Sequence, residues 1–425
     1  MKLPSWRRYM ESWYTGYGFQ GIVVFGLGAI LMPIMVKDGG DAAKAGMVIA
    51  FFYIGQMLAP LMGHITDRTG QHRLFYTSGY VLLGIGLAVF PYTELVWFWS
   101  ALAFIQGVGS GTTNTVAAMF IVEYKPKEEW DTRIGLLQTF YGVGQAVGVG
   151  LAAALQARPE FGLVFAAGLM LPGMVLGGRG LPPRQEHKKV DKAEFARRTH
   201  RPPRSVHSFL HRYEATVWQI LKRLPQEWHS RFGLYMVGWF CVMLATWLIG
   251  ALFPLLMKGA FDISYARSSL YYAVGATIGI FVYMPSGTLG KKIGDAWVVI
   301  IGTVMTLVSV AGLTVLAHIH SEVSEWLVPP VYIIIPIAWS PLIVGGTAWT
   351  AQLATFEQGE ALGCFNANTA VASVISAFTA GFVANKFGFD TVLAIGAIAC
   401  VLALLCFVPL LRSARKQLTP EAATE

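Results

Sequence analysis

The side chains of this chain that could carry chemistry are amides and aromatic rings set within long apolar stretches. Among them, Gln138, Tyr141 and Gln145 are spaced by three and four residues, so they share one face of a helix. Amides in such surroundings either bond neighbouring helices or line a cavity, because an unpaired polar group there is costly. Rings beside amide donors suit a neutral, amphipathic or aromatic solute. The candidate binding residues are Tyr17, Gln20, Gln106, Asn114, Gln138, Tyr141, Gln145, Trp239, Trp339, Asn366 and Asn368.

Ionisable residues are missing from the centres of the same apolar stretches. The carboxylates nearest to them, Asp67, Glu123, Glu357 and Glu360, stand at the ends. A charge at bilayer depth is costly and usually marks a function. We therefore expect neither a proton carrier at the membrane midplane nor a strongly ionic solute, whose desolvation would cost several kcal/mol without an opposite charge.

Enzyme motifs are also missing. The sequence has no phosphate-binding Walker loop, nucleophile elbow or dinucleotide fingerprint. The four cysteines, Cys241, Cys364, Cys400 and Cys406, lie in apolar stretches at spacings that fit no zinc or redox motif. The sequence thus predicts no enzymatic activity, no cofactor and no metal.

The elements that hold these residues are membrane spans. The chain has 425 residues, of which 55% are hydrophobic and 13% charged, whereas a soluble domain carries about 25% charged residues. A span needs roughly 20 apolar residues. Twelve segments qualify, which predicts an all-α polytopic membrane protein with 12 transmembrane helices: 13–36, 45–63, 75–93, 97–121, 133–156, 161–178, 232–257, 268–287, 297–317, 328–353, 361–384 and 390–411.

The positions of the cations predict the orientation of these spans. With the N-terminus inside, 26 of the 32 Lys and Arg residues fall on the cytoplasmic side, which is where such residues are retained. Both termini are therefore expected in the cytoplasm, with the protein in the cell membrane, here the inner membrane. This asymmetry explains the pI of about 9.2, so we expect the lipid bilayer and a small molecule as partners and no nucleic acid.

A polar stretch divides the spans into two sets. Residues 179–231 are rich in Pro, Lys and Arg and separate residues 1–178 from 232–425. Within this linker, residues 206–224 predict an amphipathic helix with a basic face, which either lies on the cytoplasmic membrane surface or packs on neighbouring loops. We expect a six-helix bundle on each side of the linker.

Internal repetition supports this division. The spacing of Gly63 and Gly70 returns at Gly287 and Gly294, and the start of the fifth span at Arg133 returns near Ala361. A duplication of this kind predicts a binding site near the midplane, between two halves that rock against each other.

The turn after the second span carries the most specific motif. Gly63, Asp67, Arg68 and Gly70 resemble the Gly-x-Leu-Ala-Asp-Arg-x-Gly-Arg-Lys signature of the major facilitator superfamily, with Gln71 and His72 in place of basic residues. The resemblance covers all twelve spans. It implies that family's fold, with two pseudo-symmetric six-helix halves, and transport by alternating access.

In the family that the chain resembles, this turn acts as a conformational latch. Two glycines allow the chain to reverse its direction within a short turn, and Asp67 can bond helix N-terminal amides or an arginine. A loop that only caps helices is the alternative. In the second copy Lys291 replaces the acid, so we expect different bonding there. The expected latch residues are Gly63, Asp67, Arg68, Gly70, Arg73, Glu123 and Arg133.

Two motifs of proton-coupled exporters are incomplete. Ala103 stands where those proteins carry an arginine in the fourth span, although Gln106, Gly107 and Gly109 fit; Gly144 and Gly148 of the fifth span lack the following proline. We expect a monomer that acts as a secondary active or facilitative transporter of a small, neutral or amphipathic organic solute, with efflux favoured. The alternative is a non-transport protein that uses this fold for pigment or lipid delivery or for anchoring an assembly.

The latch predicts the effect of replacing Asp67. Asp67→Asn should lower solute turnover while leaving folding and solute affinity in place, because it removes a charge-assisted bond worth about 1.5–3 kcal/mol, enough to shift a two-state population. Transport rate and affinity, measured on the same purified protein, test this. Unchanged turnover would show that the turn is only a cap.

Overall fold

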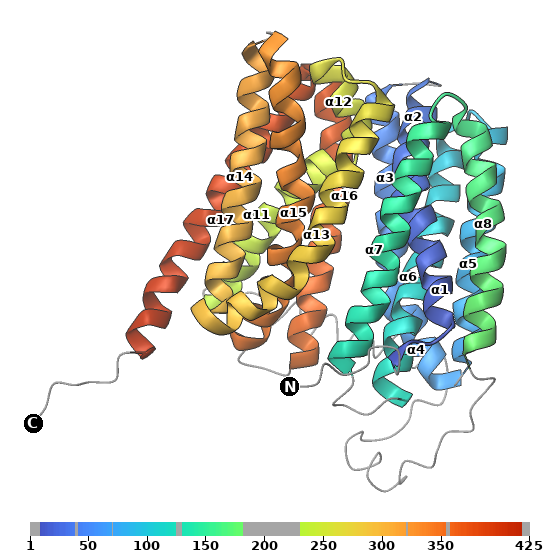
Figure 1. The fold of residues 1–425 in the computed structure, drawn as a ribbon, viewed down its shortest axis with the longest axis horizontal. Helices are drawn as coiled ribbons and strands as arrows, with labels where there is room; N and C mark the ends of the chain where they lie inside the picture. The colour runs from blue at the N-terminus through green and yellow to red at the C-terminus, as the bar shows by residue number, and fades with distance from the viewer. Residues whose placement is uncertain are drawn as a thin grey trace, which may run out of the picture.

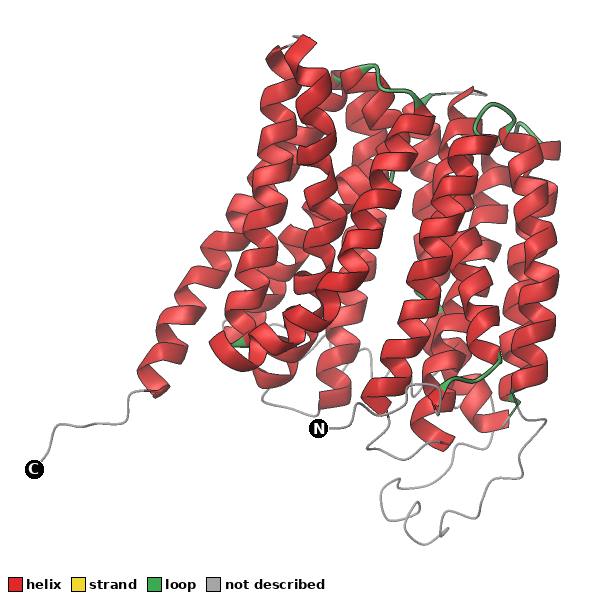
Figure 2. Cartoon of the chain, in the orientation of Figure 1, coloured by secondary structure: helices red, strands yellow, loops and turns green. Residues whose placement is uncertain are grey.

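The computed structural model describes residues 9–38, 41–69, 71–124, 130–181, 230–319, 322–353 and 358–418. Throughout these ranges the chain forms helices joined by short connections (Figure 2). The linker helix predicted over 206–224 lies outside the described residues. Short connections follow from the sequence, since each apolar stretch is followed by only a few polar or Gly residues before the next.

The N-terminal helices cover the first six predicted spans. The first span consists of three consecutive helical segments, and the second consists of two. Their bounds are α1 (Trp13–Gly21), η2 (Ile22–Gly28), α2 (Ala29–Asp38), α3 (Ala42–Gln56), α4 (Ala59–Thr69), α5 (His72–Val89), η3 (Phe90–Tyr92), α6 (Val96–Tyr124), α7 (Trp130–Leu155) and α8 (Pro159–Gly180).

The C-terminal helices cover the remaining six. The seventh span is again broken, between α11 and α12. The bounds are α11 (Arg231–Gly250), α12 (Phe253–Phe261), α13 (Tyr265–Ile293), α14 (Asp295–Ile319), α15 (Glu322–Leu353), α16 (Gln358–Phe387) and α17 (Phe389–Leu418). All twelve predicted spans therefore fall on helices.

Length and hydropathy identify these helices as membrane spans. Ten helical segments of the described chain are long and apolar enough to cross a bilayer. The helices α6 and α13, each of 29 residues, reach about 43 Å at about 1.5 Å per residue, which also exceeds a hydrocarbon core of about 30 Å. The prediction of an all-helical polytopic membrane protein is confirmed.

The helices form two groups that stand side by side, α1–α8 and α11–α17 (Figure 1). We call the end where α1 and α11 begin and α8 and α17 end the terminal face, and the opposite end, with α2 and α12, the distal face. Between the groups, α3 packs on α16, α7 on α13 and α2 on α12. The first and third of these contacts lie toward the distal face, which is therefore closed.

Glycines set the distances at which these helices pack. A Cβ atom at Gly144 of α7 would lie 2.0 Å from the carbonyl oxygen of Gly18, and one at Gly148 would lie 2.0 Å from that of Ile22. The backbones of α7 and the first span therefore touch, as small residues allow between membrane helices. Gly144 and Gly148, four residues apart on α7, therefore both serve this contact.

The second copy of the repeated turn contains an acid that is bonded to a neighbouring helix. Gly294 ends α13 at a φ of 92°, a conformation that glycine adopts without strain. Asp295 then begins α14, and its Oδ2 atom accepts a 2.6 Å hydrogen bond from Gln352 Nε2 near the end of α15. An acid is thus present in this turn, four residues beyond Lys291.

The packing of α7 gives a matched pair of substitutions. Gly144→Ala should destabilise the protein by more than about 1 kcal/mol, because its methyl group overlaps backbone that cannot move away. Gly150→Ala, on the same helix but with no atom within 4 Å of the added Cβ, should be neutral or stabilising by about 0.5–1 kcal/mol. Thermal unfolding in detergent compares them; equal effects would contradict the backbone contact.

Candidate solute-binding site

Aromatic rings connect the two groups of helices at mid-height. Trp247 of α11 lies 6.1 Å from Phe25 of η2 and 5.2 Å from Tyr53 of α3, measured between ring centroids. Both partners belong to the opposite group. Extended by Tyr141 and Tyr17, 5.0 Å apart on α7 and α1, and by Trp339, 6.0 Å from Trp247, these six rings form what we call the interface cluster.

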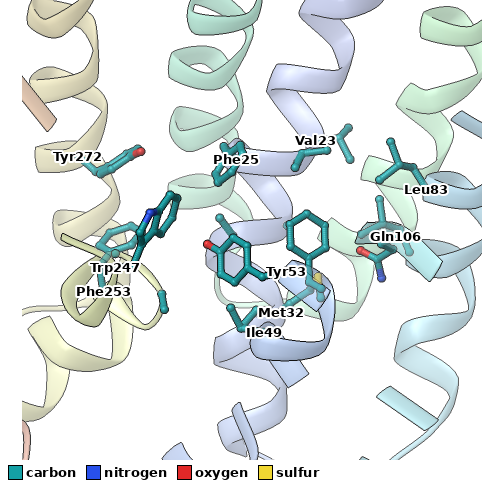
Figure 3. Close-up of a pocket in the computed structure, with 17 residues that line it drawn as sticks. Val23, Phe25, Met32, Ile49, Tyr53, Leu83, Gln106, Trp247, Phe253 and Tyr272 are labelled. Atoms are coloured by element: carbon teal, nitrogen blue, oxygen red, sulfur yellow. The ribbon is translucent and has the colours of Figure 1, made fainter. Parts of the chain in front are cut away.

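A cavity of about 70 Å³ opens beside this cluster (Figure 3). Two interrupted spans border it, with the π-helical segment η2 on one side and the break between α11 and α12 on the other. Neither a carboxylate nor a cationic side chain is among the residues that line it. The lining residues are Val23, Val24, Phe25, Gly28, Ala29, Met32, Ile49, Phe52, Tyr53, Leu83, Leu87, Gln106, Trp247, Gly250, Ala251, Phe253 and Tyr272.

Two nitrogen atoms of this lining lack a hydrogen-bond partner among the described residues. They are Nε2 of Gln106, a residue only 2% exposed, and Nε1 of Trp247. Gln106 is held over Gly86, where a Cβ atom would lie 2.4 Å from its Cγ. The glycine thus makes room for the amide. Both nitrogens are themselves buried, so they lie within the wall of the cavity and do not face its open space.

Other amides form hydrogen bonds within the N-terminal helices, among them the predicted Gln20 and Asn114. Gln20 Nε2 donates to Asn114 Oδ1 at 2.8 Å, and Gln56 Nε2 donates to Ser110 Oγ at 3.1 Å. These bonds join the first, second and fourth spans. Gln20 and Asn114 are therefore brought together, with their bond directed between helices rather than into the cavity, although Gln20 Oε1 has no partner in the described part.

Two predicted residues of α7 make contacts beside the interface. Gln145 Nε2 donates a 2.6 Å hydrogen bond to the Tyr272 hydroxyl of α13, and so links the two groups next to the cavity that Tyr272 lines. One and two turns earlier, Tyr141 belongs to the interface cluster and the exposed Gln138 interacts with the Tyr17 hydroxyl. The shared face expected for these three α7 residues is thus turned toward the interface.

The remaining predicted residues of the C-terminal helices lie apart from the cavity. Trp239 is buried, donates to Thr369 Oγ1 at 2.9 Å and packs on Phe365. Asn368 donates to the carbonyl oxygen of Met236 at 2.7 Å, while Asn366 is exposed. Trp239 and Asn368 thus stabilise the packing of α11 on α16.

Of the residues of the expected latch, the structure describes Gly63, Arg73 and Arg133. Gly63 is buried in α4 and Arg73 is exposed at the start of α5. Arg133, at the start of α7, pairs at 2.5 Å with Glu11, just before α1, and its guanidinium lies over the Tyr9 ring. The side chains of Asp67, Arg68 and Glu123, and Gly70 as a whole, lie outside the described residues.

Sequence reasoning missed several residues that the structure brings to these sites. Phe25, Tyr53, Trp247 and Phe253 line the cavity, and Glu11 pairs with Arg133. A signal for the first group was available: Gly26 and Gly28 in the first span and Pro254 in the seventh disturb the helix, and broken helices mark solute sites in transporters. The Glu11 pairing had no such signal.

Taken together, the fold and the cavity define a polytopic membrane protein with an uncharged binding site between two helical groups. Residues 14–355, well over half of the chain, match the Major Facilitator Superfamily. The chain belongs to this family. It is a secondary transporter and not an enzyme, and the expected fold is confirmed.

Individual relatives are distant. The chain is 29% identical over 142 residues to the niacin transporter NiaP of Acinetobacter baylyi, a match that covers 33% of this chain and 32% of the relative. The chain thus spans about a third of that relative's length. A crystal structure of the nucleoside transporter NupG superposes with a TM-score of 0.70 at 12% identity, covering 93% of this chain and 96% of the other, which shows the shared fold.

The Gln145–Tyr272 bond predicts a conformational effect. Tyr272→Phe removes a hydrogen bond between the two groups worth about 0.5–1.5 kcal/mol, and so should shift the population about twofold to tenfold away from the state with a closed distal face. Tyr271→Phe on the same helix is the control. The population of the state with a closed distal face is measured by labelling a cysteine introduced at that face. Equal labelling of both variants would contradict the role of this bond.

Proposed function

We propose that this protein carries a small, uncharged or amphipathic organic solute across the membrane by alternating access. The observation that carries the proposal is the cavity between the two helical groups, which is walled by aromatic rings and has no charged side chain among its described lining residues. A charged solute would lose its hydration there without gaining an opposite charge. The relatives' names, which include niacin and nucleoside transporters, agree with small ring-containing solutes.

Alternating access requires a contact between the groups that can open. Gly46 of α3 and Gly381 of α16 supply it, because a Cβ atom at Gly46 would lie 2.8 Å from Gly381 Cα. The two helix surfaces meet at these glycines near the distal face, and they can separate there without breaking a contact between charges. With the terminal face in the cytoplasm, as the cations indicate, this is a state closed to the outside; reporter fusions that place either terminus outside would reverse it.

Among the described residues that line the cavity, none has a carboxylate, an imidazole or an amine that could carry a proton. The carboxylates that could serve, Asp67 and Glu123, stand at the ends of predicted spans. We therefore propose facilitative transport, or coupling only through those two. The glycines of α7 that favoured efflux are accounted for by packing against the first span, so the solute gradient sets the direction in this proposal.

Flux in proteoliposomes tests these proposals together. Solute uptake should be saturable, and it should change little when a pH gradient of about one unit, equivalent to about 1.4 kcal/mol per proton, is imposed. Strong concentrative uptake that an uncoupler abolishes would reveal a proton site that the cavity does not show. Folded protein without flux of any solute would favour the non-transport alternative, a membrane anchor or delivery protein.

A further inference from the structure

Two arginines stand next to each other where α5 begins and α8 ends. A Cβ atom at Gly178 of α8 would lie 2.8 Å from Cγ2 of Thr77 and 3.9 Å from Nε of Arg73. The Arg73 guanidinium therefore rests against the last turn of α8, beside Arg179. In Figure 1, α5 and α8 lie on the side of the N-terminal group that faces away from the C-terminal group. The two arginines are thus remote from the cavity between the groups.

Both arginines lack an acidic partner. Within the described part of the chain their side chains are exposed and form neither a hydrogen bond nor an ion pair. The helices themselves offer no acid nearby, since α5 has none and α8 has only Glu160, at its opposite end. Arg179 is favourable at the negative end of the α8 dipole, but Arg73 stands at the positive end of the α5 dipole, where a cation is unfavourable. Helix stability therefore does not account for Arg73.

Apolar side chains continue from the arginines along the outside of both helices. On α8, Leu171 and Val175 precede Arg179 by eight and four residues, so they share its face, and both are exposed. On α5, Val81 and Ile85 are exposed as well. Both helices have the length and hydropathy of membrane spans. The apolar residues therefore face lipid tails, and the arginines at the span ends reach the level of the lipid headgroups.

We propose that Arg73 and Arg179 bind the headgroup phosphate of an anionic phospholipid, whose acyl chains lie along the apolar outer face of α5 and α8. The N–H groups of an arginine form a fork that matches phosphate oxygens. The lipid supplies the negative charge that no described side chain supplies here, and its tails cover the apolar surface, which a free phosphate cannot do. This site is separate from the solute cavity, so the inference does not depend on the proposed function.

Lipid binding to the purified full-length protein, measured by native mass spectrometry in detergent, tests the proposal. Phosphatidylglycerol should bind more tightly than phosphatidylcholine, whose choline group cancels the charge of the phosphate. Arg73→Gln/Arg179→Gln should weaken binding of the first phosphatidylglycerol roughly twentyfold, because each arginine near an anionic headgroup contributes about fivefold. Equal binding of the two lipids by the wild-type protein, or unchanged phosphatidylglycerol binding in this variant, would overturn the proposal.

A matched variant separates a specific site from a general effect of charge. Arg158→Gln/Arg231→Gln removes two other exposed arginines at span ends and should bind phosphatidylglycerol as the wild-type protein does. An equal loss in both double variants would show a response to net charge alone and would refute the site. Glycerol 3-phosphate, which has the phosphate but no acyl chains, should not displace the lipid; displacement would identify a site for soluble phosphate instead.

Thermal unfolding in detergent gives a second readout. Without added lipid, both double variants should unfold at the wild-type temperature, because the replaced side chains are exposed and unpaired. Added phosphatidylglycerol should raise the unfolding temperature of the wild-type protein and of Arg158→Gln/Arg231→Gln, since a ligand of the native state stabilises it. It should not do so for Arg73→Gln/Arg179→Gln. A rise of the same size in all three proteins would contradict the proposal.

Discussion

Inside a bilayer every backbone N–H and C=O group must find its partner within the protein, and this constraint governs the rest of the structure. It explains why the described spans are helices. It also applies to side chains: Gln20 bonds Asn114, and Gln145 bonds Tyr272. Two buried N–H groups in the cavity wall, on Gln106 and Trp247, have no partner among the described residues and so depart from this pairing.

Since lipid tails are as apolar as leucine, the helices gain little hydrophobic energy by packing and depend on close contact instead. Glycines make that contact possible. Within the N-terminal helices, a Cβ atom at Gly107 would lie 1.9 Å from the carbonyl oxygen of Phe52, so α3 and α6 are joined as one body. Between the groups, Gly46 meets Gly381. The same type of contact thus serves permanent packing in one place and separable packing in another.

The cavity lies where two spans depart from a regular α-helix. The first span changes to a π-helix over Ile22–Gly28, and the seventh breaks between Gly250 and Phe253. Irregular backbone in a membrane protein is tolerated where it borders a cavity, and each group contributes such a break. A solute bound there touches both groups, so its affinity depends on their relative position. This dependence is the requirement for coupling binding to movement.

The sequence by itself determined the number and positions of the spans, because hydropathy over about 20 residues is a local property. It also identified the polar residues inside them, including Gln106. Only the tertiary structure decided which of these amides pair and which line the cavity. Gln20 and Asn114 meet across 94 positions of the chain, whereas Gln106 meets no described donor or acceptor at its nitrogen. Likewise Trp247 reaches the cavity and Trp239, two turns earlier on the same helix, stays in the core. Helical spacing tells which residues share a face, but the neighbour of that face is set by how distant helices pack.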